Sequence, residues 1–222
     1  MKVSTIISFL TGYLLIKHNK EKQIGNMLLA FGIILIGFFT IFTLIYSIIA
    51  KAWAIILFLK FGMIAILFGV TLLILTMKVL IHSSLWIKKP EKWIYISLTL
   101  ILSIIMAATG YITVNDEINS VTSFNPFVFY PFALYILLML IYGSFSIYEF
   151  GIKRNEGNTK KRMVYFFSGL IILIFALITD SIGNFFPELE LIFDLILFSS
   201  ITIAMILLAR VFLLKQKNQN EN

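Results

Sequence analysis

Seven apolar runs, separated by short charged connections, extend over the whole 222-residue chain. A helix needs about 20 apolar residues to cross roughly 30 Å of hydrocarbon. The runs are long and continuous, without the alternating pattern of about ten residues that marks a barrel strand, so they predict membrane-spanning helices. The predicted spans are residues 3–16, 24–50, 52–82, 93–114, 126–150, 163–186 and 187–214.

The first run is short for a span and follows a basic residue, as the apolar core of a signal peptide does. The segment Thr11-Gly12-Tyr13 makes a poor cleavage site, because such sites carry small residues in alternation. We expect the first helix to be retained. The alternative is a mature protein of six helices with both ends inside, which the distribution of charges disfavours.

The composition excludes a soluble domain. Hydrophobic residues make up 60% of the chain and charged residues 13%, against about 45–50% and 25% in globular proteins. The fold class predicted is therefore an all-α, polytopic membrane bundle, with residues 1–215 as a single transmembrane domain and 216–222 as a short polar tail. The absence of Cys removes disulfides, thiol catalysis and thiolate metal sites. Frequent Ile, Lys and Asn favour a prokaryotic origin.

Charge is distributed unequally between the two sets of connections. Of the 18 Lys and Arg, all but Lys2, Lys51 and Lys60 fall in or beside alternate connections and the C-terminal tail. The other side carries most of the acids, namely Asp116, Glu117, Asp180, Glu188, Glu190 and Asp194. Because positive loops stay in the cytoplasm, we expect seven spans in a cell membrane, with the N-terminus outside and the C-terminus inside.

The sequence also predicts the start of one helix and several faces on which helices pack closely. Asn125-Pro126 predicts an N-cap followed by proline in the first turn of the fifth span. Small residues four apart predict faces on which helices pack closely. These pairs are Ser8/Gly12, Ala65/Gly69, Ser103/Ala107 and Ser200/Ala204.

Ionisable residues inside the predicted spans are candidates for a site, because each costs about 2.5–3.5 kcal/mol to insert. Lys60, Asp180 and Asp194 fall in the outer third of the membrane, so Lys60 has the depth to pair with either acid. The full candidate set for an outward-facing polar, cationic or pH-sensitive site is Lys60, Tyr111, Asn115, Tyr130, Asp180, Asn184, Glu190 and Asp194. The alternative is that these groups only extend to the lipid headgroups.

The sequence offers few residues for catalysis or metal binding. The two histidines, His18 and His82, lie at or near cytoplasmic connections, which leaves haem, di-iron and zinc sites without a ligand set. We expect no catalytic residues, no metal and no cofactor. The net charge of +7 reflects topology and not a nucleic-acid partner. The expected partners are the lipid bilayer and a membrane or cytoplasmic protein that meets the basic inner loops.

Residues 14–35 (LLIKHNKEKQIGNMLLAFGIIL) form a short first helix and a charged connection that leads into a long second helix. This layout resembles the seven-helix membrane sensor region at the N-terminus of some prokaryotic histidine kinases. The resemblance covers all seven helices in layout and rests on no specific motif, and we expect no transmitter domain after Leu214. It implies a protein that senses envelope or membrane signals and passes them inward.

The function that these features favour is a non-catalytic, receptor-like or sensory membrane protein that acts through a partner. A small-solute or ion transporter or channel is the first alternative, and it predicts a continuous polar path across the bilayer. The inner halves of the spans are apolar, so one protomer offers little of such a path. A structural subunit of a membrane complex is the second alternative, and it predicts a fixed packing face.

Overall fold

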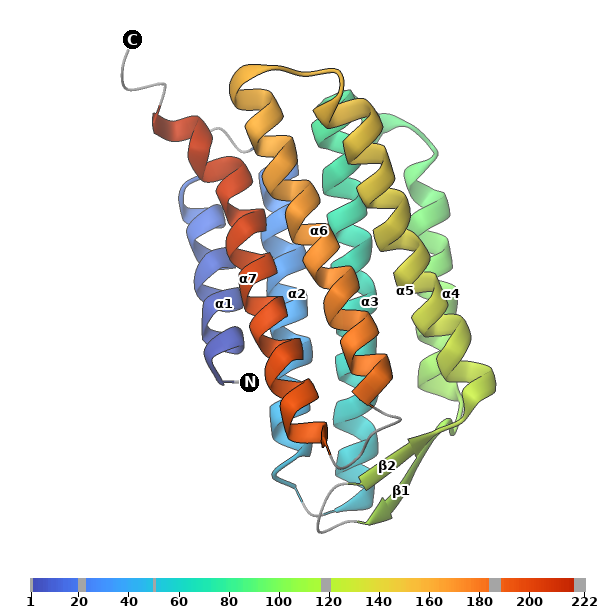
Figure 1. Cartoon of the computed structure of the whole chain (residues 1–222). Coiled ribbons are helices and arrows are strands. Elements are labelled where there is room, and N and C mark those ends of the chain that lie inside the picture. The colour runs from blue at the N-terminus through green and yellow to red at the C-terminus, as the bar shows by residue number, and fades with distance from the viewer. Residues whose placement is uncertain (1, 20–22, 50, 117–120, 184–188, 218–222) are drawn as a thin grey trace.

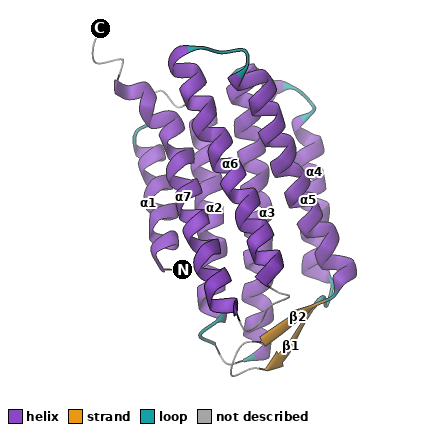
Figure 2. Cartoon of the chain, in the orientation of Figure 1, coloured by secondary structure: helices purple, strands orange, loops and turns teal. Residues whose placement is uncertain are grey.

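The chain forms a bundle of helices with a small β-hairpin at one end (Figure 1). Within the residues that it describes (2–19, 23–49, 51–116, 121–183 and 189–217), the computed structural model has seven α-helices and two strands. The helices are α1 (Lys2–Lys17), α2 (Ile24–Tyr46), α3 (Ala52–His82), α4 (Lys92–Ala108), α5 (Pro126–Ser146), α6 (Gly157–Gly183) and α7 (Glu190–Lys217). Figure 2 shows how far helix dominates.

Two short helical turns and a two-stranded hairpin complete the architecture. The 3₁₀ turn η1 (Ser84–Lys88) follows α3, and the π-helical turn η2 (Ile147–Ile152) continues α5. Strand β1 (Ile112–Asp116) pairs antiparallel with β2 (Val121–Phe124). The Asn125 side chain accepts a hydrogen bond of 3.0 Å from the Phe127 N–H, so the predicted N-cap of α5 is confirmed.

Five helices are long and apolar enough to cross a membrane. They cover Ile24–Tyr46, Ala52–His82, Pro126–Ile152, Gly157–Ile182 and Ile192–Phe212. The chain is thus a multi-pass, membrane-embedded helical protein. The other two helices are shorter, with 16 residues in α1 and 17 in α4. At 1.5 Å per residue they reach only about 24 and 26 Å, less than the roughly 30 Å of a hydrocarbon core.

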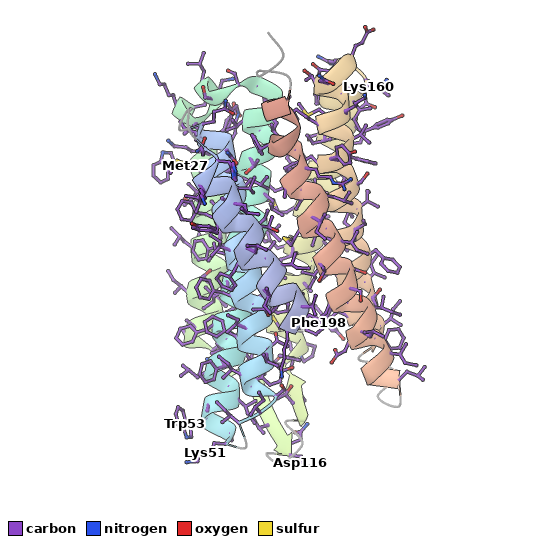
Figure 3. The ribbon with its side chains drawn as sticks, turned by 90° about the vertical axis from the view of Figure 1, so that its left-hand side faces the viewer. Met27, Lys51, Trp53, Asp116, Lys160 and Phe198 are labelled. Carbon is purple, nitrogen blue, oxygen red and sulfur yellow. The ribbon has the colours of Figure 1, made fainter. Side chains whose placement is uncertain are left out.

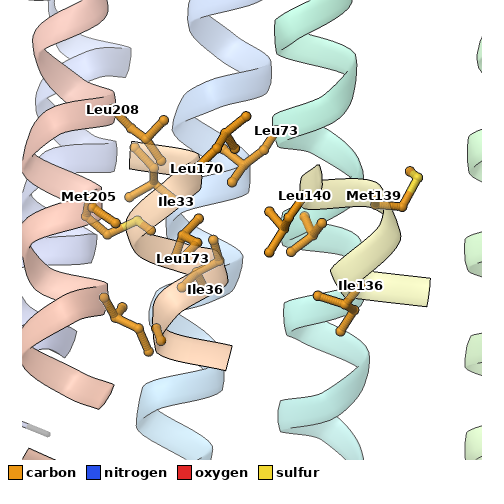
Figure 4. Packing of buried hydrophobic residues seen from close by; sticks show 14 of the residues in the cluster. Ile33, Ile36, Leu73, Ile136, Met139, Leu140, Leu170, Leu173, Met205 and Leu208 are labelled. Atoms are coloured by element: carbon orange, nitrogen blue, oxygen red, sulfur yellow. The ribbon is translucent and has the colours of Figure 1, made fainter. Parts of the chain in front are cut away.

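The five long helices close into a ring. Helix α2 packs on α3, α3 on α5, α5 on α6, α6 on α7, and α7 returns to α2. The two shorter helices lie outside this ring, α1 against α2 and α7, and α4 against α3 (Figure 1). The interior of the ring is filled by aliphatic side chains from all five helices. Ile33, Leu73, Leu140, Leu170 and Met205 are among those that meet there (Figure 4).

Helix ends sort into two groups, as the alternating charges predict. The end of α1, the start of α2, the α3–α4 and α5–α6 connections and the end of α7 lie at one end of the bundle, here called the basic end (Figure 1). The α2–α3 connection and the hairpin lie at the other, the hairpin end. Figure 3 shows Lys51, Trp53 and Asp116 at the hairpin end and Lys160 at the basic end.

Three of the four predicted small-residue pairs lie in helix contacts. Ser8 and Gly12 are buried against α2, where a Cβ on Gly12 would lie 2.5 Å from Cγ1 of Ile34. Ala65 and Gly69 are buried on α3, and Ser200 and Ala204 on α7. The fourth pair is only half right, because Ser103 is buried and Ala107 is exposed.

The predicted end of the fourth span is wrong. The span predicted over 93–114 ends as a helix at Ala108, and residues from Ile112 onward form β1. The β-branched residues of β1 favour a strand. In addition, the Tyr111 carbonyl accepts a 2.7 Å hydrogen bond from the Asn125 N–H, which joins the two sides of the hairpin.

The connection between the predicted spans 126–150 and 163–186 is mostly helical as well. The turn η2 continues to Ile152, and α6 begins at Gly157, so Lys160, Lys161 and Arg162 belong to its first turns. Gly157 has a φ of +58°, a left-handed conformation that glycine adopts without strain, and it makes the tight entry into α6. Helix α7 reaches Lys217, past the predicted tail boundary at 215, and residues 218–222 lie outside the described part.

Candidate functional site

A cavity lies inside the helix ring, and one carboxylate lines it. Its volume is about 50 Å³. Its lining residues come from all five ring helices: Ile36, Phe39, Ile66, Val70, Ile136, Leu140, Leu173, Ala176, Leu177, Asp180, Leu197 and Ile201. Asp180 of α6 is the one ionisable residue among these described lining residues.

Asp180 stands near the end of α6 at the hairpin end and is partly buried. Asp194, in the second turn of α7, is also partly buried, and the two carboxyl groups are close enough to interact electrostatically. Asp180 is the lining residue of α6 that lies nearest to the hairpin end, so the acidic groups stand on that side of the cavity. The site therefore combines an apolar interior with acidic groups at one end.

The size of the cavity limits what fits in it. One water needs roughly 10–15 Å³, whereas an engineered cavity that binds benzene has about 150 Å³ and pockets for drug-sized ligands have about 300–1,000 Å³. The cavity of about 50 Å³ lies between water and benzene on this scale. By volume, the cavity has room for a few waters or for one small cation beside the carboxylate.

Lys60, the cation predicted to pair with Asp180 or Asp194, belongs to a different cluster. Its ammonium donates hydrogen bonds of 2.9 Å to the Ala107 carbonyl and 2.7 Å to the Thr109 carbonyl, at the C-terminal end of α4. The last carbonyls of a helix lack partners within the helix and carry the negative end of its dipole. Lys60 of α3 thus caps α4 from the side.

Tyr111 lies beside this lysine, with the Lys60 Nζ 5.8 Å from the ring centroid. It is 1% exposed, and burial raises the pKa of its phenol above the ordinary value. No described residue forms a hydrogen bond with its hydroxyl. Its ring stacks on Phe124 at 6.3 Å, and Phe124 stacks on Phe129 at 4.8 Å, so an aromatic column joins the hairpin to α5.

The other candidates are more scattered. Asn115 is exposed on β1, where its side-chain oxygen accepts a bond of 3.5 Å from the Ser123 hydroxyl. Tyr130 is 60% exposed on α5, edge-on to Phe129. Asn184 lies outside the described residues, and Glu190 is the first residue of α7 with its side chain outside them. Of the candidate set, the structure brings Lys60 to Tyr111 and Asp180 to Asp194.

A line of polar contacts, not predicted from the sequence, joins α4 and α5 to α3. In the middle of the bundle, the Thr71 and Thr99 hydroxyls are 2.6 Å apart, and Thr99 is 3.3 Å from the Tyr135 hydroxyl. Nearer the basic end, Lys78 bonds to Tyr142. The signal was present as polar residues four or seven apart within each helix, a spacing that places them on one face.

Comparison of the chain with protein-family models, curated proteins and solved structures found no match. Within the described part of the chain, no three His, Cys, Asp or Glu side chains gather as a metal site would require. The features that bear on function are therefore the Lys60–Tyr111 contact, the Asp180–Asp194 pair and the cavity inside the helix ring.

Proposed function

We propose that the chain is a receptor-like protein of the cell membrane that takes up a small monovalent cation at Asp180 and signals through a partner at its basic end. The cavity inside the helix ring, with Asp180 at its edge, is the observation that carries this proposal. An ionisable group held inside membrane helices is by default a functional one. The cation enters from the hairpin end, which we place outside because positive connections stay in the cytoplasm.

Helix α6 provides the route from the site to the other face. It carries Asp180 near one end and Arg162 near the other, 18 residues or about 27 Å away. The Arg162 Nε donates a 2.6 Å hydrogen bond to the Val211 carbonyl of α7, and its guanidinium lies 5.2 Å from the Phe212 ring. A shift of α6 against α7 at the cavity would therefore change this contact at the basic end.

The experiment compares small and large cations at one ionic strength. Thermal unfolding of the detergent-purified protein is followed in Na⁺, in K⁺ and in N-methylglucamine, a cation too large for the cavity. We expect saturable stabilisation by a small cation, which amounts to about 2.7 kcal/mol at a hundred times the dissociation constant. Asp180→Asn should abolish it, and Asp116→Asn, which removes an acid of the same end outside the cavity lining, should not.

Hydrogen exchange supplies the second measurement. The same small cation should change exchange in the last turns of α7 and the first turns of α6. If stabilisation is equal in all three cations, or survives Asp180→Asn, the proposal is wrong. A Na⁺ or K⁺ flux in proteoliposomes that depends on Asp180 would replace the receptor with the transporter or channel that is its main alternative.

The layout resemblance to histidine kinase sensor regions agrees with a sensory role. In this proposal seven helices cross the bilayer, α1 and α4 included, and the protein acts without catalysis of its own. A structural subunit, the remaining alternative, predicts no cation response in either measurement.

A further inference from the structure

Three polar side chains from three helices converge near the basic end. Lys78 of α3 donates a hydrogen bond to the Tyr142 hydroxyl of α5, and its Nζ lies 4.8 Å from the centroid of that ring. The Tyr95 hydroxyl of α4 is 3.5 Å from the Tyr142 hydroxyl and donates to it. The cluster formed by Lys78, Tyr95 and Tyr142 is called the lysine–tyrosine cluster below.

No acid among the described residues forms an ion pair with the Lys78 ammonium. Lys153 and Glu149 form the one ion pair within the described residues, and Lys78 takes no part in it. Glu91 belongs to the same end of the bundle, but its carboxylate accepts a 3.2 Å hydrogen bond from the Trp86 indole. An ammonium has three donors, and the bond to Tyr142 uses one of them.

The cluster lies about one helical turn inside the end of α3 and is partly exposed on the outside of the bundle. Lys78 comes four residues before the end of α3, about 6 Å in from it. Lys78 and Tyr95 are partly exposed, and Tyr142 is 38% exposed. Helices α4 and α5 both pack on α3 but barely on each other, so the cluster has α3 behind it and a helix on each side.

We propose that this cluster binds the phosphate of an anionic phospholipid from the leaflet at the basic end. Lys78 supplies the charge, and the Tyr142 hydroxyl, which accepts hydrogen bonds from Lys78 and Tyr95, donates its own proton to a phosphate oxygen. A basic site between helices at this depth matches the position of lipid headgroups, which Lys and Arg attract. The acyl chains then lie along α4 and α5, whose Leu98 and Leu138 are exposed.

The experiment measures the binding of phosphatidylglycerol to the detergent-purified protein by native mass spectrometry. Lys78→Met should weaken binding at least tenfold, and Tyr142→Phe several-fold. The matched control is Lys89→Met, which removes an exposed lysine of the same end and should leave binding unchanged. Zwitterionic phosphatidylcholine should bind more weakly than phosphatidylglycerol to the parent protein.

Two outcomes overturn the proposal. One is phosphatidylglycerol binding that Lys78→Met and Lys89→Met weaken equally, which would indicate general attraction to a basic surface. The other is displacement of the lipid by millimolar inorganic phosphate in the parent protein, with phosphate binding that Lys78→Met abolishes. That result would assign the cluster to a soluble phosphate. If Lys78→Met does not fold, two other variants test the proposal. Lys78→Arg should keep lipid binding, whereas Tyr142→Phe should weaken it. If neither variant weakens lipid binding, the proposal is contradicted.

Discussion

Gly69 of α3 faces Gly32 of α2 so closely that a Cβ on Gly69 would lie 3.1 Å from the Gly32 carbonyl oxygen. The same Cβ would lie 2.9 Å from Cγ1 of Ile36. Helices in lipid gain no hydrophobic free energy by meeting each other, so close backbone approach through small residues stabilises their contact. These two glycines therefore set the distance between the two helices that make the most extensive contact in the bundle.

Gly69→Ala should destabilise the protein. The new Cβ meets backbone, which cannot move aside as a side chain can, and overpacking of this kind costs about 1–3 kcal/mol. The free energy of unfolding can be followed in mixed micelles by titration with a denaturing detergent. Gly110→Ala is the matched control, because a Cβ there meets nothing within 4 Å. Equal effects of the two substitutions would contradict the close-contact explanation.

Lys60→Met should loosen the end of α4. The substitution leaves the carbonyls of Ala107 and Thr109 without the ammonium that now bonds to both, and lost hydrogen bonds of charged groups cost about 1.5–3 kcal/mol. Because Lys60 is partly exposed, we expect about 1 kcal/mol or less in unfolding. Amide exchange at residues 105–109 should be faster, whereas Lys51→Met at the same end should leave it unchanged.

The helices and their alternation were predictable because long apolar runs admit few other structures in a membrane. The hairpin was not, because the apolar residues from Tyr111 to Val114 continue the preceding run. A short apolar run does not distinguish strand from helix. The two shorter helices were predicted as spans, yet neither reaches the length of the five ring helices.

The sequence allowed the candidate residues to be predicted, but not the groups that each of them contacts. A charge inside an apolar run stands out in any sequence, which is how Lys60 and Asp180 were found. Lys60, however, bonds to two main-chain carbonyls, and a carbonyl has no residue type that a sequence could reveal. The cavity beside Asp180 depends on five helices converging, and apolar sequence alone does not record which helices become neighbours.

The Thr71–Thr99 contact should contribute measurably to stability. Both side chains are buried and their hydroxyls are 2.6 Å apart, although Thr71 also bonds to the Leu67 carbonyl of its own helix. A double-mutant cycle with Thr71→Val and Thr99→Val should give a coupling free energy of about 0.6 kcal/mol, and at most about 1.7. The same cycle between Thr71 and Thr202 should give none, because Thr202 lies on α7, which does not pack extensively on α3.

Tyr111→Phe should be neutral or stabilising at pH 7, by up to about 1 kcal/mol, because the hydroxyl that it removes is buried without a partner among the described residues. Burial raises the pKa of Tyr111, so the folded protein keeps this proton while the unfolded chain loses it above about pH 10. Stability should therefore fall as the pH rises past 10. The fall should be smaller in Tyr111→Phe than in the parent protein, as unfolding at pH 7 and above pH 10 would show.

Single cysteines on either side of α4 should react from opposite faces of the membrane. The chain contains no Cys, so each substitution introduces the only thiol. Ser123→Cys in β2 and Ser84→Cys in η1 alter exposed side chains that bracket α4. We expect a membrane-impermeant maleimide to label Ser123→Cys on intact cells, and Ser84→Cys only after the cells are permeabilised.

The pair of variants separates two features of the proposed topology. Reaction of Ser84→Cys alone on intact cells would mean that the bundle crosses in the opposite orientation, with its basic end outside. Reaction of both would mean that α4, with 17 residues, does not cross the bilayer. The first result would also place Asp180 toward the cytoplasm, because the hairpin end and the end of α6 lie together (Figure 1).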